Sequence, residues 1–216
     1  ALSGEFYQRL IRGLAHSVLF LSNGNATSII GFNTLWPISI GLNPYHFGGA
    51  ANFTALSKAT RREVSSWLLP LVEATGLVGL NSLDFVVTPE GRPLALEVNP
   101  RPSATLGLYD EDVPEGLLYR HLLATRGILP EVPRSAAFRA FHVMLAPHNL
   151  CVGRSTWPAW CQDRPRPSTR IHRYEPFCTV SAAGSTPAQT LSRLKRRLRT
   201  IQHTLLNPTR QAPPTP

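Results

Sequence analysis

The segment 81–105, NSLDFVVTPEGRPLALEVNPRPSAT, constrains the fold of this 216-residue chain more than any other part. Two apolar runs, 83–87 and 93–98, flank a short polar loop that contains a proline and a glycine. Two strand-like runs separated by such a loop predict a β-hairpin. The hairpin then fixes which side chains of the two runs lie side by side.

Three oxygen-bearing side chains are predicted to gather on one face of this hairpin. Glu97 and Asn99 are two residues apart in the second run and therefore share a face, and the fold brings Asp84 near Glu97. Carboxylate and amide oxygens suit Mg²⁺, so we predict a metal site at these three residues. Arg101 offers a planar donor to a phosphate or carboxylate beside the metal, which suggests phosphoryl transfer. The alternative is an ordinary amphipathic hairpin with surface charges, although an unpaired charge inside an apolar strand is costly.

The same residues resemble the metal-binding end of the ATP-grasp ligase superfamily. The similarity rests on Asp84, on the run EVNPRP at 97–102 and on GLVG at 76–79. It implies an α+β fold in which a mostly antiparallel sheet is flanked by helices, as in the C-terminal lobe of an ATP-grasp enzyme. It also implies ATP and Mg²⁺ as cofactors, with Mn²⁺ as an alternative metal. Arg101 resembles the arginine that contacts the acyl-phosphate or carboxylate substrate.

The segment 5–21 is similar to the family pattern Y-x-Q-x-x-x-x-G-x-x-x-S-x-x-F. By that resemblance Tyr7, Gln8, Arg9 and Leu10 border the nucleotide base and ribose. Many members of the family carry an acidic residue after the glutamine, and Arg9 departs from that pattern. For Gln8 the alternative is an ordinary polar residue of an edge strand.

The resemblance implies an ATP-dependent carboxylate–amine ligase that works through an acyl-phosphate intermediate. Its partners would be a small-molecule carboxylate and an amine, and Ser103 and Thr105 are candidates for contacts to the carboxylate, or else plain turn residues. The chain corresponds to only about half of such an enzyme. We expect the N-terminal substrate domain and the phosphate-holding small lobe in the same or another chain, and this chain alone to be inactive.

Two other functions remain open from the sequence. One is a non-catalytic remnant of the ATP-grasp fold with a scaffold or regulatory role. The other is a nucleic-acid-binding protein, because the formal net charge is +9 and many cations fall near the C-terminus. A solvated helix face explains these cations better, so nucleic acid is an unlikely partner. The cations are Arg193, Lys195, Arg196, Arg197 and Arg199.

Composition points to a globular protein of the cytoplasm. The chain contains no apolar run long enough to cross a bilayer and no secretory signal at its start, so we expect no membrane partner. Its three cysteines, Cys151, Cys161 and Cys178, form no C-x-x-C pair, which argues against a disulfide framework and against zinc. Reduced thiols are the default inside the cell.

Residue patterns predict the remaining elements. Further strands are expected over 17–21, 26–32, 138–145 and 177–182. Helices are expected over 56–75, 114–126 and from 187 onward. Pro70 should kink or shorten the first helix, and Pro114 should occupy the first turn of the second. The turn-rich segment 36–53, in which Gly48–Gly49 permits close backbone approach, is expected to be an irregular loop lining a site.

The last helix carries clear signals at its start. Thr186 should cap it, Pro187 should occupy its first position, and Gln189 should complete a capping box. A 3–4 repeat of apolar residues should pack this helix on the sheet. That stripe is Leu191, Leu194, Leu198, Ile201 and Leu205. We expect one ATP-grasp lobe over 1–206 and a flexible, proline-rich tail over 207–216.

Overall fold

The computed structural model describes residues 9–41, 43–133, 135–154 and 156–205. The predicted tail lies outside this range. The longer strands are β1 (Leu14–Asn23), β2 (Thr27–Ile40), β3 (Asn43–Ala51), β4 (Val78–Val87), β5 (Pro93–Asn99), β6 (Phe138–Leu145) and β10 (Pro176–Gly184). Three two-residue strands are β7 (Leu150–Cys151), β8 (Cys161–Gln162) and β9 (Arg170–Ile171). The helices are α1 (Lys58–Thr75), α2 (Leu117–Thr125) and α3 (Pro187–Leu205), with 3₁₀ turns η1 (Ala104–Leu108) and η2 (Asp110–Asp112).

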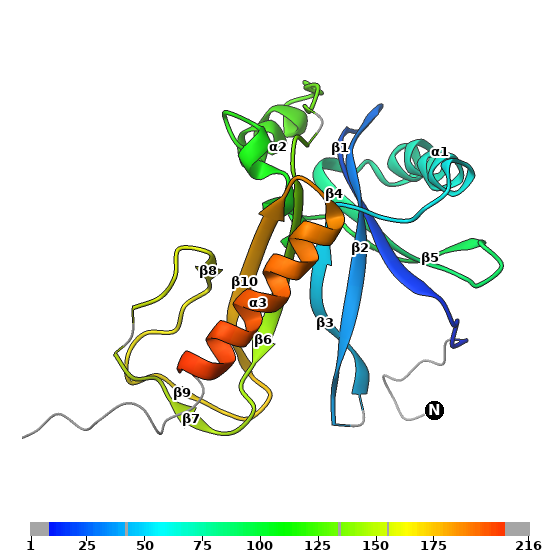
Figure 1. The fold of residues 1–216 in the computed structure, drawn as a ribbon. Helices are drawn as coiled ribbons and strands as arrows, with labels where there is room; N and C mark the ends of the chain where they lie inside the picture. Colours follow the sequence, from blue (N-terminus) through cyan, green and yellow to red (C-terminus); the bar gives the residue numbers. More distant parts are fainter. Residues whose placement is uncertain (1–8, 42, 134, 155, 206–216) are drawn as a thin grey trace, which may run out of the picture. The chain divides into compact units, whose positions relative to one another are not determined.

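Eight of the strands form one antiparallel sheet in the order β5-β4-β1-β2-β3-β6-β10-β8 (Figure 1). With the three helices this confirms the predicted α+β class. The chain divides into two compact units, which are described separately. The first comprises residues 1–34, 55–104 and 115–132, and the second comprises 35–54, 105–114 and 133–216. The expectation of a single lobe over 1–206 stays a prediction.

In the first unit, α1 packs its apolar face on β1, β2 and β4 (Figure 1). The helix contributes Val64, Leu68 and Val72, all fully buried. The strands contribute Val18, Phe20, Phe32, Leu83 and Phe85. Because side chains alternate along a strand, residues 17, 82 and 84 lie on the opposite face of the sheet. The packing of α1 thus decides which face of the predicted hairpin is covered by the helix and which face carries Asp84.

Helix α1 runs through Pro70 without being shortened, contrary to one of the two predicted effects. Pro70 is exposed, so the carbonyl that its ring leaves without a partner can be solvated. The Ser57 side chain caps the start by accepting from Thr60 N at 3.0 Å. Gly76 ends the helix in the left-handed conformation and donates to Val72 O at 2.8 Å, as expected of a C-terminal glycine.

Helix α2 begins at Leu117 rather than at Pro114, so the predicted start was wrong. Gly116 precedes it with φ 78°, a left-handed conformation that separates Pro114 from the helix. The predicted end is confirmed, because Gly127 has φ 85° and donates to Ala124 O at 3.1 Å. The glycine before the helix outweighs the helix-starting preference of the proline.

The segment 36–53 is a pair of strands, not the irregular loop that was expected. From Trp36 to Ile40, half-buried residues alternate with exposed ones, the period of a strand, and Pro37 occupies an exposed position. Turn formers cluster only at the connection, where Gly41 has φ 57°. The many proline and glycine residues of the whole segment obscure this alternation in the sequence. That the segment lines a site stays a prediction.

Gly49 is required by the packing of the second unit. A Cβ added there would collide with the carbonyl oxygen of Phe141 in β6 and with the indole of Trp36. The close backbone approach expected at Gly48–Gly49 is therefore present, and the neighbour is a strand of the protein itself.

Helix α3 lies along β6 and β10 of the second unit (Figure 1). Gln189 N donates to the Thr186 hydroxyl at 3.2 Å, so the predicted cap is confirmed. The Gln189 side chain accepts from Ser185 N at 2.8 Å, one residue earlier than in a standard capping box. These two hydrogen bonds tie the first turn of the helix to the preceding loop.

The inward face of α3 differs at one predicted position. Leu194 and Ile201 are buried, but Leu191 is 45% exposed. Thr190 occupies the buried place instead, because its hydroxyl donates to Phe138 O at 3.0 Å and thereby satisfies its own polar group. Leu198 packs on the same core, and the Leu205 side chain lies outside what the structure describes.

Two arginines of α3 contact the edge of β10, which corrects the expectation that all five C-terminal cations are solvated. Arg193 and Arg197 each donate at 2.5 Å to a β10 carbonyl, of Ala183 and Ser181 respectively. Arg197 also lies over the Trp160 ring, 5.1 Å from its centre. These contacts cover a sheet edge that would otherwise present unpaired carbonyls. The exposed cations are Lys195, Arg196 and Arg199.

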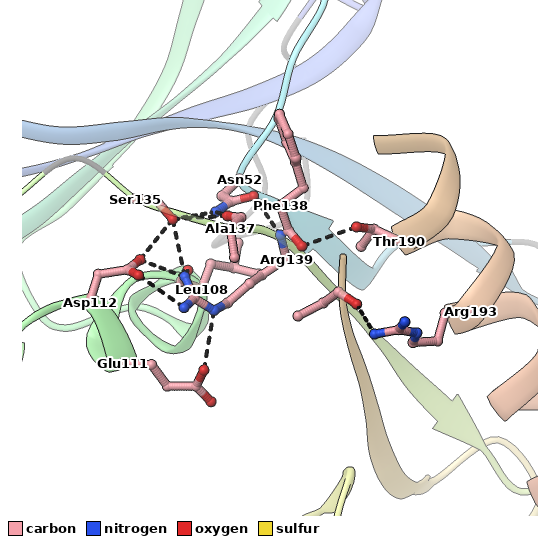
Figure 2. Close-up of polar contacts among 11 residues, drawn as sticks. Asn52, Leu108, Glu111, Asp112, Ser135, Ala137, Phe138, Arg139, Thr190 and Arg193 are labelled. Atoms are coloured by element: carbon pink, nitrogen blue, oxygen red, sulfur yellow. Dashed lines mark hydrogen bonds and ion pairs between the residues drawn. The ribbon is translucent and has the colours of Figure 1, made fainter. Parts of the chain in front are cut away.

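Arg139 is the centre of a partly buried polar network in the second unit (Figure 2). It binds Asp112 at two positions, 2.5 Å and 3.0 Å, and the two side chains are only 12% and 9% exposed. Ser135 donates to the same carboxylate at 2.7 Å, and Asn52 accepts from Arg139 N at 2.7 Å. Burial alone would raise the pKa of Asp112, but the bonds from Arg139 and Ser135 outweigh it and lower the pKa. The network ties η2 to β6.

No α-helix in the described part of the chain is long and apolar enough to cross a membrane. The three cysteines are free thiols; Cys151 is exposed, and Cys161 and Cys178 are buried.

Asp112→Asn should lower the free energy of unfolding by about 3 kcal/mol, because it leaves the nearly buried Arg139 charge with only the exposed Glu111 carboxylate as an ionic partner. Glu111→Gln removes a second carboxylate from the same arginine, but that side chain is 77% exposed, so the loss should be about 0–1 kcal/mol. Urea denaturation at pH 7 measures both. Since the pKa of Asp112 is lowered, the difference should shrink as the pH falls below about 4. Equal losses from the two variants would contradict this account.

Candidate metal and phosphate site

The predicted hairpin is present as β4 and β5. Its loop closes where Thr88 N donates to Arg92 O at 3.0 Å, and Gly91 in the loop has φ 82°. The pairing places Asp84 directly opposite Glu97 and Ser82 directly opposite Asn99. The juxtaposition of Asp84 and Glu97 that the sequence suggested is therefore confirmed.

A one-residue bulge in β5 produces this juxtaposition. Val87 pairs with Pro93 and Phe85 with Ala95, but the next pair is Asp84 with Glu97, so Leu96 is skipped. Without the skipped residue, Asp84 would face Leu96, and Glu97 would fall on the face that packs against α1, because a one-residue slip exchanges the faces. The bulge thus brings the acidic side chains of both strands to one face.

Asp84, Glu97 and Asn99 lie on the sheet face opposite the α1 core. The Asn99 amide nitrogen donates to Glu97 Oε1 at 3.1 Å, which turns the amide oxygen to a different direction and leaves it to accept or coordinate. Asp84 and Asn99 are half-buried, while Glu97 is exposed. Three oxygen donors therefore border a surface that a ligand can reach.

The electrostatics at Asp84 favour a bound cation. The pKa of Asp84 is raised to about 6, first by burial and then by the negative charge of Glu97, while Arg101 partly opposes both effects. Two carboxylates in facing positions repel each other until a positive charge lies between them. The protein therefore holds an energetically unfavourable pair in the absence of a cation.

Arg101 lies close enough to influence that pair. Its backbone N–H donates to Asn99 O at 2.9 Å, which forms a tight turn immediately after the metal-ligand candidates. Its exposed side chain donates one hydrogen bond, from Nη1 to Pro102 O at 3.3 Å. The guanidinium has five N–H donors, so most of its fork can still meet an anion.

The donor set fits Mg²⁺. Among the described residues no group of three or more His, Cys, Asp or Glu side chains could hold a metal, so a third protein donor at this hairpin would have to be the amide oxygen of Asn99. Two carboxylates and an amide are hard oxygen ligands, and Mg²⁺ usually completes its shell with water and phosphate oxygens rather than with further protein groups. The same set admits Mn²⁺.

The other predicted site residues are placed differently. Arg9 and Leu10 are exposed and precede β1 in irregular structure, while Tyr7 and Gln8 lie outside the described residues. Ser103 is half-buried in the first unit just before η1. Thr105 is buried in η1 and belongs to the second unit. Arg9, Leu10 and Ser103 thus belong to the same unit as the hairpin and Thr105 does not, and the roles of all these residues stay predictions.

Sequence reasoning missed two polar residues beside the hairpin. Ser17 of β1 lies directly opposite Asp84, and Asn33 of β2 lies directly opposite Ser17. The Asn33 amide donates to the Ser17 hydroxyl at 3.0 Å, and the two residues are 0% and 1% exposed respectively. For Ser17 the available signal was the serine of the family pattern over 5–21, which falls on this residue, whereas Asn33 lies in a strand of mixed polar and apolar residues that gave no clear signal.

Residues 2–105 match the sequence model of the ATP-grasp domain family. This match covers the metal-ligand candidates and the segment similar to the nucleotide-binding pattern. The chain is an ATP-grasp domain protein. Among curated proteins no significant match to the sequence was found.

Solved structures of ATP-grasp enzymes share the fold. The L-amino acid ligase from Bacillus licheniformis is 13% identical with a TM-score of 0.68 over 88% of this chain and 53% of its own. N5-carboxyaminoimidazole ribonucleotide synthetase from Thermotoga maritima is 10% identical, with a TM-score of 0.66 over 89% and 53%. Biotin carboxylase from Campylobacter jejuni is 10% identical, with a TM-score of 0.70 over 89% and 46%. The chain thus spans about half the length of these proteins.

Asp84→Asn should stabilise the metal-free protein at neutral pH. Because the folded-state pKa of Asp84 is about 6 and an unfolded aspartate has a pKa near 4, folding binds a proton between these values. The free energy of unfolding should therefore fall as the pH rises from about 4 to about 6 in the native protein. The variant should lack this fall and be more stable by about 1–2 kcal/mol at pH 7.5, with allowance for solvent screening.

Thermal denaturation in the presence of a chelator, from pH 4 to pH 8, measures the effect. Asp163→Asn is the control, because Asp163 is exposed and its left-handed backbone also suits asparagine. Parallel pH profiles for the native protein and Asp84→Asn would contradict the assigned electrostatics.

Proposed function

We propose that this chain is the metal-bearing half of an ATP-dependent carboxylate–amine ligase. The observation that carries the proposal is the bulged hairpin, which sets Asp84 opposite Glu97 with Asn99 on the same face and Arg101 beside them. Membership of the ATP-grasp domain family supports the use of ATP. The titles of the similar structures name a ligase, a synthetase and a carboxylase, which supports activation of a carboxylate or bicarbonate-like group.

In the proposed reaction, a carboxylate oxygen of the substrate attacks the γ-phosphorus of ATP. The bond from that phosphorus to the β,γ-bridging oxygen breaks, giving an acyl phosphate and ADP. The amine nitrogen then attacks the acyl carbon, the bond to the phosphate oxygen breaks, and the nitrogen loses a proton. The products are an amide, ADP and phosphate, and no covalent bond to the protein is formed.

Asp84, Glu97 and Asn99 would hold Mg²⁺, which when bound neutralises charge on the β- and γ-phosphates. Arg101 would contact the transferring phosphoryl group or the acyl phosphate with its planar fork, and it is the residue we propose as catalytic. The chain's own residues therefore contribute position and charge compensation rather than a nucleophile.

The remaining assignments follow from the family resemblance. Tyr7, Gln8, Arg9 and Leu10 would border the base and ribose of ATP, and Ser103 and Thr105 would contact the carboxylate substrate. The partners would be a small carboxylate and a small amine in the cytoplasm. The part of an ATP-grasp enzyme that this chain does not span would come from the same or another polypeptide.

Glu97→Gln should abolish carboxylate activation without unfolding the protein. The substitution removes one ligand charge from an exposed position, so the loss of rate should be about 10²-fold or more while the melting temperature changes little. The assay incubates the complete ligase with Mg²⁺, ATP, candidate amino acids and hydroxylamine, which traps an acyl phosphate as a hydroxamate. Glu90→Gln is the matched control, because Glu90 is exposed in the loop of the same hairpin. Near-native hydroxamate formation by Glu97→Gln would refute the metal-site assignment.

A further inference from the structure

The net positive charge of the chain is concentrated in the second unit. That unit contains 13 lysine and arginine residues and 5 aspartate and glutamate residues, whereas the first unit contains 9 and 8. Three of the five acidic residues make up η2, and two of these contact Arg139 (Figure 2). The second unit therefore has a strongly positive field, which attracts anions from solution.

Residues 141–205 carry almost all of this excess charge. They include ten lysine and arginine residues and only two acidic residues, Asp163 and Glu175. Among the described residues of this stretch no ion pair is formed. Eight of the ten cations are exposed, and seven of these eight are arginines. The charges are therefore available to a partner in solution.

Helix α3 sets three of the exposed cations in one row. Lys195, Arg196 and Arg199 lie three and four residues apart, so they share one side of the helix. At 3.6 residues per turn, that side is opposite Leu194 and Ile201, which are buried against the sheet. The helix contains no acidic residue, so none of the three cations has a carboxylate partner on α3.

An ordinary solvated helix face does not account for this row. Such a face usually alternates charges of both signs, because opposite charges four residues apart stabilise a helix and like charges destabilise it. On α3 every charged side chain is a cation. Their crowding acts on Arg197, whose pKa is lowered first by burial and then by the charges of Arg193 and Arg196. The sequence pattern made nucleic acid the less favoured partner, and this arrangement reverses that preference.

The chemistry of the row fits a phosphate backbone better than an acidic protein. Protein–protein interfaces have an apolar centre, whereas interfaces with nucleic acid are more polar and strongly positive. From 192 to 203, the exposed positions of α3 carry only Ser, Lys, Arg, Thr, Gln and His side chains. Arginine predominates among the cations of the second unit, and its planar fork can bind two phosphate oxygens at once.

We propose that the outer face of α3 binds the phosphodiester backbone of a nucleic acid without selecting its sequence. Lys195, Arg196 and Arg199 would each neutralise a phosphate, and the exposed arginines between 154 and 173 would add to the attraction. The inference is independent of the proposed ligase activity, because the candidate metal site lies in the first unit.

The test measures the fluorescence anisotropy of a labelled RNA of about 20 nucleotides, a DNA of the same sequence and the corresponding duplex DNA. Each is titrated with the full chain from about 50 to about 200 mM salt. The dissociation constant should be about 1–100 μM at physiological salt and should rise steeply with the salt concentration. Preference for RNA or for DNA then identifies the source of the backbone. Binding that is absent, or that does not respond to salt, would overturn the inference.

Replacing Lys195, Arg196 and Arg199 together by glutamine should weaken binding by about tenfold or more at about 50 mM salt. The slope of the logarithm of the binding constant against the logarithm of the salt concentration should become shallower. The change should be about 2 with a single strand and about 3 with a duplex. The melting temperature should not fall, because the variant removes like charges from an exposed helix face.

A matched control variant removes the same charge from the first unit by placing glutamine at Lys58, Arg62 and Arg92, which are exposed. Its affinity for RNA should stay within about twofold of the native value. Equal losses from the two triple variants would show that binding follows net charge alone and would overturn the inference.

Unlabelled polyglutamate of matched length distinguishes a nucleic acid from an acidic protein. It should displace the labelled RNA at least about tenfold less effectively than unlabelled RNA does, since a polypeptide finds no apolar centre on this face. Polyglutamate that competes as well as RNA would assign the face to an acidic protein and overturn the inference.

Discussion

The candidate site depends on one skipped residue in β5. By passing over Leu96, the pairing with β4 moves Glu97 and Asn99 to the face of Asp84 and leaves Val98 to pack with the α1 core. A regular hairpin with the same sequence would bury the glutamate against α1 and turn Val98 to the opposite face. The requirement that an apolar side chain, and not a carboxylate, meets α1 therefore favours the bulged register over the regular one.

The same register brings together two carboxylates that repel each other. Burial is the first cause of the raised pKa of Asp84 and the charge of Glu97 the second, and Arg101 relieves only part of both. A metal-binding site is expected to be strained in this way without its metal, because ligand oxygens must be concentrated before the cation arrives. Folding of the first unit tolerates the strain because α1 and its partner strands supply a continuous apolar core on the other face.

Charge is used differently in the second unit. There Arg139 and Asp112 neutralise each other in a nearly buried, fully bonded pair, and Arg193 and Arg197 donate to edge carbonyls. These groups meet protein partners, whereas Asp84 is only half-buried and no protein group is seen to donate a hydrogen bond to its carboxylate in the described part of the chain. The contrast separates charges that hold the fold from charges that would act on ligands.

The sequence by itself determined the hairpin, the closeness of Asp84 and Glu97 and most helix and strand positions, because hydrophobic period and turn residues act locally. The α+β class followed from the resemblance of its motifs to the ATP-grasp family. The sequence patterns predicted the wrong structure for 36–53, where turn-forming residues outnumbered a weak alternation of buried and exposed positions. They also predicted the wrong start of the second helix, at Pro114, because the neighbouring Gly116 sets where that helix begins. Only the tertiary structure decided the bulge at Leu96 and the alignment of Ser17 and Asn33 with Asp84. Register and face depend on which strands pair and which side a helix covers, and these contacts join residues far apart in the chain.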